Sequence, residues 1–150
     1  MIMHPLNLVI ASDHAGVHLK SHVAHMLMKD TPHMLVDLGP FSTDRVDYPD
    51  YARQACAHVL DGQSHRAILI CGSGIGMSMA ANRFAGIRCA VVTDPYMAEL
   101  SRAHNNSNVI SLGARVLGPD MAWRCVQAWL STPFEGGRHE ARLSQLDEQS

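Results

Sequence analysis

The sequence has no excess of positive charge: its 150 residues carry a formal net charge of −2 at pH 7. This balance argues against a nucleic-acid-binding protein, because such proteins usually carry a basic surplus. Lysine is scarce, since only Lys20 and Lys29 accompany ten arginines. The planar arginine side chain suits bidentate contacts with phosphate or carboxylate groups. The skew toward arginine therefore favours an anionic ligand.

Long apolar runs and cysteine motifs are also missing. No stretch approaches the roughly 20 apolar residues that cross a bilayer, and residues 1–5 lack the basic segment and apolar core of a signal peptide. The four cysteines form no C-x-x-C pair and no zinc-ligand spacing. Cys56, Cys89 and Cys125 lie in apolar segments typical of the core. We expect a soluble cytoplasmic protein with reduced thiols.

Short β-branched runs alternate with longer helical patterns, and the length suits one domain over residues 1–150. This alternation predicts an α/β fold: a Rossmann-like three-layer α/β/α sandwich with a five-stranded parallel sheet and a C-terminal helix. The tail beyond about residue 143 is expected to be a peripheral helix end or disordered. Strands are predicted at Leu8–Ser12, Met34–Leu38, Ala67–Cys71, Cys89–Thr93 and Val109–Leu112. Helices are predicted at Gly16–Lys29, Pro49–Leu60, Gly76–Phe84, Pro95–Ala103 and Pro119–Leu130, three of which begin with a helix-compatible proline.

A glycine-rich loop, Cys71–Gly76, follows the third predicted strand. Backbone N–H groups at the start of the next helix favour an anion or a developing oxyanion. The spacing does not match a dinucleotide fingerprint, because the third glycine comes one residue early, and no Gly-Lys-Ser/Thr of a phosphate-binding Walker loop is present. A tight turn without chemistry is the alternative. Cys71 weakens that alternative, because a helix N-terminus can activate a thiol as a nucleophile or a base.

Asp13 and His14 follow the first predicted strand in the equivalent place. Asp13 is expected to cap the following helix, and His14 could equally be a solvated loop residue. Both strand ends should open on the same crevice, which favours a functional role. His14 also begins a helical stripe with His18, His22 and His25. Without a carboxylate or cysteine on that stripe, a solvated face is a better interpretation than a metal site.

Three further polar groups could bind or transfer protons. His104 opens an asparagine-rich run whose alternative role is turn formation, although a histidine there could act as a general acid or base. Arg138 and Arg142 lie four residues apart, hence on one helical face. They form either a solvated basic face or a phosphate clamp after Gly136-Gly137. Arg115, at the end of the last predicted strand, is another candidate.

Together these segments resemble the ribose-5-phosphate isomerase type B family, which also contains galactose-6-phosphate and allose-6-phosphate isomerases. The resemblance extends from Leu8 to about Arg142. Six segments carry it in order: Ser12–Gly16 (SDHAG), Asp47–Pro49 (DYP), Cys71–Gly76 (CGSGIG), Asn82–Arg88 (NRFAGIR), His104-Asn105, and Glu135–His139 (EGGRH). Each alone is moderate evidence, and all six in order are highly specific.

The resemblance implies catalytic roles for Cys71, His104, Ser73 and Asp13. Cys71 would shuttle the proton between C1 and C2 through a cis-enediolate, and Ser73 would position the substrate. His104 would open the sugar ring with help from Asp13. One branch of the family uses a glutamate in the glycine loop as the base, at the position that Ile75 occupies here. The chain therefore resembles the cysteine branch.

The resemblance also implies the substrate contacts. His14, Arg138 and Arg142 would bind phosphate, the glycine loop would supply oxyanion donors, and Arg115 corresponds to an arginine that a neighbouring subunit can supply. The full expected set is Asp13, His14, Tyr48, Gly72, Ser73, Gly74, Ile75, Gly76, Asn105, Arg115, Arg138, His139 and Arg142.

The expected reaction is the interconversion of D-ribose 5-phosphate and D-ribulose 5-phosphate, a step of the pentose phosphate pathway. It needs a base, hydrogen-bond donors that stabilise an oxyanion, and groups that bind the phosphate, so no metal and no cofactor is expected. We expect a homodimer, or a dimer of dimers, with active sites at the subunit interface, and activity that rises through the neutral pH range. The alternatives are isomerisation of another phosphosugar (allose 6-phosphate, galactose 6-phosphate or a four-carbon ketose phosphate) and a non-catalytic sugar-phosphate sensor.

Overall fold

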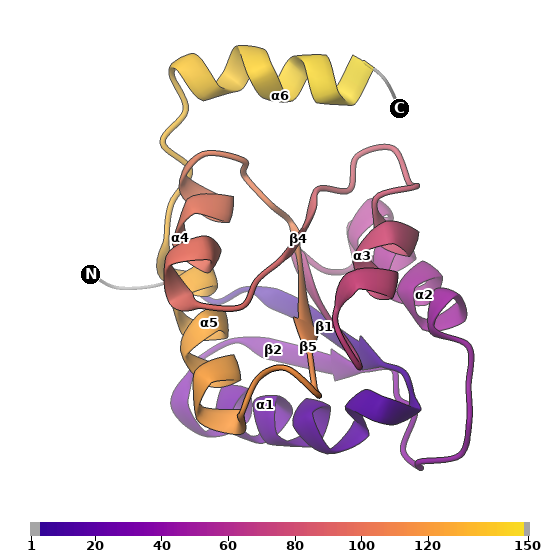
Figure 1. The fold of residues 1–150 in the computed structure, drawn as a ribbon. Helices are drawn as coiled ribbons and strands as arrows, with labels where there is room; N and C mark the ends of the chain where they lie inside the picture. Colours follow the sequence, from indigo (N-terminus) through magenta and orange to yellow (C-terminus); the bar gives the residue numbers. More distant parts are fainter. Residues whose placement is uncertain (1–3, 149–150) are drawn as a thin grey trace.

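Five parallel strands form the centre of the structure, a computed structural model that describes residues 4–148 (Figure 1). The first three residues of the segment that lacks signal-peptide features, and the last two of the tail, lie outside the described residues. The strands are β1 (Asn7–Ser12), β2 (Met34–Asp37), β3 (Arg66–Cys71), β4 (Cys89–Val91) and β5 (Val109–Gly113). They lie in the order β2-β1-β3-β5-β4. The predicted parallel sheet is confirmed.

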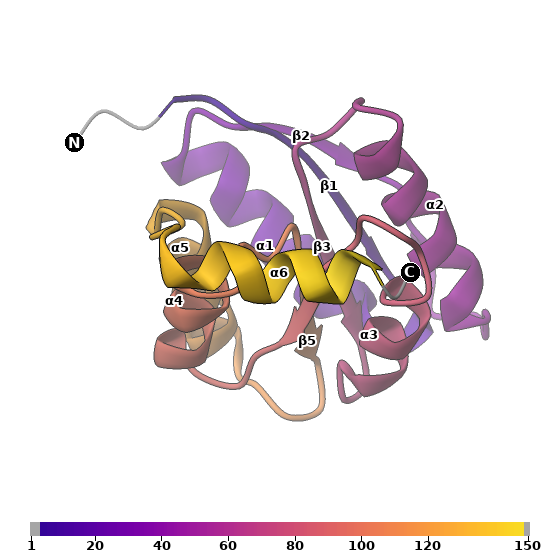
Figure 2. The ribbon, with the colours of Figure 1, turned by 90° about the horizontal axis from the view of Figure 1, so that it is seen from above.

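Helices cover both faces of this sheet. They are α1 (Val17–Asp30), preceded by a short 3-10 turn, η1 (His14–Gly16), then α2 (Tyr48–Leu60), α3 (Ile75–Ala81), α4 (Pro95–Ala103), α5 (Pro119–Ser131) and α6 (Arg138–Glu148). Helices α1, α4 and α5 pack on one face, and α2 and α3 pack on the other. Helix α6 stands apart from both layers, across the end of the sheet where β5 begins (Figures 1 and 2).

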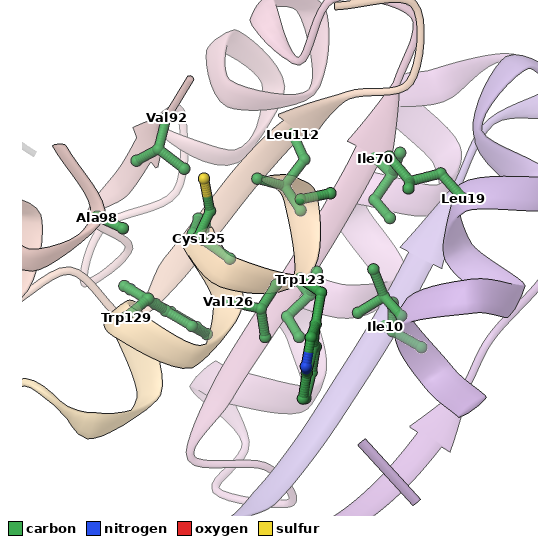
Figure 3. Close-up of a cluster of buried hydrophobic side chains, with 14 of the residues drawn as sticks. Ile10, Leu19, Ile70, Val92, Ala98, Leu112, Trp123, Cys125, Val126 and Trp129 are labelled. Atoms are coloured by element: carbon green, nitrogen blue, oxygen red, sulfur yellow. The ribbon is translucent and has the colours of Figure 1, made fainter. Parts of the chain in front are cut away.

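Alternating strand residues supply the two halves of the core. In β1, for example, Ile10 faces the α1/α5 side and Val9 the α2/α3 side. The larger half surrounds α5, where the fully buried Trp129 lies near Val126 and Ala98 (Figure 3). The three central strands, β1, β3 and β5, are apolar and buried on both faces, as parallel strands usually are.

The strand order reverses between β1 and β3. From β1 the chain moves outward to β2, and from β3 it continues on the other side to β4 and β5. Ligands of open α/β sheets bind outside the carboxyl ends of strands at such a reversal. The first strand ends at Ser12 and the third at Cys71, so the topology places the Asp13 and Cys71 segments side by side.

Most predicted boundaries lie within two residues of the observed ones, but the predicted end of α3 at Phe84 is wrong. The helix ends at Ala81, because Asn82 turns away to pair with the next strand. Its side-chain Nδ2 donates to the Cys89 carbonyl (3.0 Å), and its Oδ1 accepts from the Cys89 N–H (2.8 Å). Among residues 4–148, no helix is long and apolar enough to cross a membrane.

Candidate active site

A cavity of about 360 Å³ opens at the carboxyl ends of β1, β3 and β5. Its walls come from four segments that are distant in sequence. They are lined by Asp13, Tyr48, Cys71, Gly72, Ser73, Gly76, Arg115 and Val116. Seven of these eight residues belong to the set expected from the sequence, and the structure therefore brings them together within one chain.

Cys71 is the last residue of β3, and its side chain is 5% exposed. The Gly74 N–H donates a hydrogen bond to Cys71 Sγ at 3.2 Å. This contact fixes the sulfur beside the glycine loop. The loop therefore contacts the thiol as well as turning the chain.

The neighbouring strand, β5, fixes the position of the glycine loop. Ser111, in the middle of β5 and fully buried, donates to the Gly74 carbonyl oxygen at 2.6 Å. Gly113 allows the loop to approach β5 closely: a Cβ atom there would lie 2.7 Å from the Ser73 carbonyl group. The backbone donors of the loop are therefore fixed before any substrate arrives, as oxyanion stabilisation requires.

Asp13 caps the following turn, as expected, and it also lines the cavity. Its Oδ1 accepts hydrogen bonds from the N–H groups of Ala15 (2.9 Å) and Gly16 (3.2 Å), so it caps the turn before α1. The same side chain lines the cavity.

His14 is half-buried, and its Nδ1 accepts from the Val46 N–H at 3.2 Å. His14 is not part of the cavity lining, although it is adjacent to Asp13 in sequence.

Arg115 and Tyr48 form the outer walls. The Arg115 guanidinium lies over Gly72, where an added Cβ would meet its Nη1 atom at 3.3 Å, and the Tyr48 ring lies closer still to Gly76, 2.8 Å from an added Cβ. The Arg115 backbone is fixed by donation to the Gly72 carbonyl at 2.9 Å. Because β5 is paired directly with β3, Arg115 lines the same cavity as the Cys71 of its own chain. That a neighbouring subunit supplies an arginine to the site stays a prediction.

The other three cysteines are unsuited to chemistry, as the sequence indicated. Burial raises the pKa of Cys56 to about 12 and that of Cys125 to about 11. Burial, with smaller contributions from Cys56 and Cys71, also raises the pKa of Cys89. At neutral pH these thiols stay protonated, and a protonated thiol is neither a good base nor a good nucleophile.

Ile75 begins α3 and Gly74 caps it, next to the cavity, whereas five other expected residues lie at the opposite end of the sheet. His104 ends α4, Asn105 follows it, and Arg138, His139 and Arg142 lie on α6. Asn105 lines a second cavity, of about 380 Å³, together with Arg88 and Asp147. An Arg88–Asp147 ion pair at 3.3 Å connects α6 to this end of the sheet.

The strand register gives the distance between Cys71 and the segment that contains His104. Cys71 pairs with Gly113 at the carboxyl end of β5, and Ala67 pairs with Val109 at its start. The His104 segment precedes Val109, so it lies beyond the start of β5. Four strand steps of about 3.3 Å place Cys71 on the order of 13 Å from that start, whereas proton transfer needs groups about 3 Å apart. Cys71 and His104 of one chain therefore lie at opposite ends of the sheet.

The asparagine run forms a turn, and one of its members faces a cavity. Asn106 adopts a left-handed backbone (φ 45°), and its side chain accepts from Arg102 at 2.8 Å. Asn108 bridges to the Arg88 N–H and the Gly86 carbonyl, both at 2.8 Å. These two asparagines build the turn, and Asn105 is the member that faces a cavity.

His104 belongs to a cluster of its own. Its ring stacks on the His139 ring with centroids 4.3 Å apart. Glu135 Oε2 lies 3.9 Å from His104 Nε2 and 3.5 Å from His139 Nε2. Glu135 belongs to the EGGRH segment, in which only Arg138 and His139 were expected to have a role.

Known proteins resemble this chain along nearly its whole length. The sequence model of the family described as Ribose/Galactose Isomerase matches residues 8–146. The chain belongs to this family. Ribose-5-phosphate isomerase B of Escherichia coli (strain K12) is 46% identical over 135 residues, which cover 89% of each protein.

Solved structures of the family extend the agreement to the fold. The ribose 5-phosphate isomerase of Thermotoga maritima is 45% identical, with a TM-score of 0.94, over 97% of this chain and 99% of that one. The ribose-5-phosphate isomerase B of Mycoplasma genitalium, solved with bound ribulose-5-phosphate, is 36% identical, with a TM-score of 0.88, over 99% of this chain and 97% of that one. The family expected from the six sequence segments is confirmed.

Sequence reasoning missed two contributors to this isomerase-family site. Val116 completes the cavity lining, and Ser111 anchors the glycine loop. Ser111 carried a usable signal, since it is a lone polar residue inside an apolar strand, and a buried hydroxyl needs a hydrogen-bond partner. Val116 carried none, because an aliphatic residue in a surface loop has no distinguishing pattern.

Proposed function

We propose that the chain interconverts D-ribose 5-phosphate and D-ribulose 5-phosphate through a cis-enediolate, with Cys71 as the base. The observation that supports this most directly is the hydrogen bond from the Gly74 N–H to Cys71 Sγ, inside a cavity that Asp13 and Arg115 also line. A thiolate with hydrogen-bond donors around it meets the needs of proton abstraction next to a carbonyl group.

The proton balance of the reaction is simple. Cys71 thiolate removes the proton from C2 of the open-chain aldose, and the electron pair forms the enediolate, whose oxygen charge is met by the Ser73 hydroxyl and the loop N–H groups. The protonated Cys71 then returns the proton to C1, while a hydroxyl proton moves between the two oxygens. The thiolate is regenerated, so neither a cofactor nor a redox partner is consumed.

We further propose that each active site combines two copies of the chain. One copy would supply Asp13, Ser73, Cys71 and Arg115. The second would supply His104 to open the sugar ring, Asn105 to hold the substrate, and the α6 residues Arg138, His139 and Arg142. With His14, these arginines would bind the phosphate. The support is the separation of the two groups within one chain, at opposite ends of the sheet.

The chemistry is tested by incubating D-ribulose 5-phosphate with the protein in heavy water and following deuterium incorporation together with product formation. Replacement of Cys71 by Ala should reduce turnover by a factor of about 10² to 10⁴, the usual contribution of a general base. Cys125→Ala is the matched control, since Cys125 is a buried thiol that lines neither cavity, and it should keep normal turnover.

Full turnover by Cys71→Ala would refute the assignment of the base. A panel of five-carbon and six-carbon aldose phosphates, compared by kcat/KM, tests the choice of sugar. The four cysteines are free, which suits the reducing cytoplasm where we expect the enzyme to act.

A further inference from the structure

We infer that His104, Glu135 and His139 form a binding site for a zinc-like divalent transition metal. The three side chains offer one ligand atom each, and these atoms lie within 4.8 Å of one another. Two imidazoles and one carboxylate are a ligand set that zinc accepts, with a water molecule in the fourth position. The mixture of nitrogen and oxygen also disfavours Mg²⁺ and Ca²⁺, which prefer oxygen alone.

Two of the three distances are close to those of one small ion. Ligand bonds of about 2.1 Å in tetrahedral geometry place the ligand atoms about 3.4 Å apart. His139 Nε2 and Glu135 Oε2 are at 3.5 Å, and His104 Nε2 is 3.9 Å from the same oxygen. The ligand atoms of the two histidines are up to 4.8 Å apart, and their rings stack at an angle of 16°. Binding of one ion therefore requires the His104 ring to leave the stack and turn toward Glu135, and the partial exposure of both side chains permits this movement.

His139 gives the independent indication of a missing ligand. Its side chain is only 5% exposed, yet its Nε2 has no hydrogen-bond partner among the described residues. A buried polar atom without a partner is costly, and native structures rarely tolerate one without a reason. This same atom points toward Glu135, where the metal would lie.

The backbone holds the cluster in place. The Glu135 N–H donates to the Ala103 carbonyl at 3.0 Å, which fixes Glu135 beside the end of α4 and thus beside His104. Gly136 and Gly137 then both adopt positive φ, 69° and 59°, a conformation that costs glycine little. This turn brings His139, in the first turn of α6, back toward the Glu135 side chain.

Occupancy of this site would inhibit the enzyme, a consequence that rests on the proposed function. A metal bound to His104 requires the lone pair of its imidazole nitrogen, so the same ring could not exchange protons with the sugar. The site would therefore be regulatory, and the reaction itself would run without metal.

Calorimetric titration of the chelator-treated full-length protein with Zn²⁺ tests the binding. We expect one ion per chain, and at least a tenfold loss of affinity in Glu135→Gln and in His139→Gln. Glu135 is exposed, so its variant should fold normally even if the His139 variant does not. Bound Co²⁺, followed by its visible absorption, should show the same dependence on Glu135.

Two control variants separate this site from other metal ligands. His18→Gln removes an exposed histidine of the α1 stripe, and Cys71→Ser removes the reactive thiol; both should bind Zn²⁺ as the unmodified protein does. Wild-type affinity in Glu135→Gln would overturn the proposal, and so would loss of binding in either control variant.

Activity measurements then test the regulatory part. Zn²⁺ should inhibit isomerisation, a chelator should restore it, and Glu135→Gln should need at least tenfold more Zn²⁺ for equal inhibition. Glu135-dependent binding without inhibition would refute regulation. A chain that binds Zn²⁺ but never isomerises the sugar in the presence of chelator would refute the proposed function and leave the metal site intact.

Discussion

The separation of Cys71 from His104 leads to a quantitative expectation for mixed dimers. Cys71→Ala removes the base, and His104→Gln removes the ring-opening group. Each variant alone should be nearly inactive on the cyclic sugar phosphate, because in both active sites of such a dimer one essential group is missing. A dimer with one chain of each kind is different. Cys71 of the His104→Gln chain faces His104 of the Cys71→Ala chain, and that site is complete.

Random pairing of the two variants sets the activity that should be recovered. Equal amounts of the two chains form about half mixed dimers, and each mixed dimer has one complete site out of two. Activity per chain should therefore recover to about one quarter of the wild-type value. If each chain held a complete site of its own, every site in the mixture would lack one group and no activity would return.

The assay is production of both variants in one cell, each with a different affinity tag, followed by two-step purification of the mixed dimer. The purified species should have about half of the wild-type activity, since one of its two sites is complete. A double variant, Cys71→Ala with His104→Gln on one chain, paired with the unmodified chain, is the matched control. There each site lacks one group, so that species should be inactive.

The activities of the two mixed dimers show whether an active site combines groups from two chains. Activity in the double-variant control, together with none in the complementing pair, would show that both groups act within one chain. That result would refute the geometric reasoning from strand register, and the folded positions of His104 and α6 would have to differ from those described.

Two further expectations concern the loop and the pH dependence of stability. Gly113→Ala would place a Cβ atom 2.7 Å from the Ser73 backbone, so kcat/KM should fall at least tenfold, with stability reduced by about 1–3 kcal/mol. Gly118→Ala is the control, because a Cβ atom there would have nothing within 4 Å, and it should change neither kcat/KM nor stability. Equal effects in both variants would contradict the packing argument. Burial, with a smaller contribution from the charge of Arg66, lowers the pKa of His33, whose Nδ1 accepts from the Leu6 N–H at 2.9 Å. The unfolded chain therefore binds the extra proton more readily, so the free energy of unfolding should decrease as the pH falls below the ordinary histidine value of about 6.5, and His33→Gln should flatten that decrease in urea titrations.

The fold was predictable because its signals are local. Short β-branched runs alternate with amphipathic segments, and Pro49, Pro95 and Pro119 each lie within the first two residues of a helix. The end of α3 was not predictable from such signals. It depends on the side chain of Asn82 reaching Cys89 in β4, and that contact exists only once the sheet has assembled.

The site was predictable in composition but not in arrangement. Asp13 and Cys71 were expected to meet, because each follows a strand, and both line one cavity. His104 precedes a strand, and in a parallel sheet a residue before one strand lies at the opposite end from a residue after another. Strand polarity alone therefore implied the separation. The sequence resemblance obscured it, because motifs that act on one substrate need not come from one chain.

This polarity also constrains how two copies can associate. Each chain has one end that carries Cys71, the proposed base, and one end that carries His104, the proposed ring-opening group, with the sheet between them. A two-fold axis that brings the Cys71 end of one copy to the His104 end of the other necessarily makes the reverse contact as well, because the two partners of such an interface use the same surface. Both sites are then completed by one closed dimer. A head-to-tail arrangement would instead complete one site per contact and leave an unmatched end on each chain, so it would grow into a ring or a filament. Light scattering distinguishes these arrangements: activity that stays with a species of two chains, or of two such dimers, supports the two-fold pairing, and activity confined to larger open assemblies contradicts it.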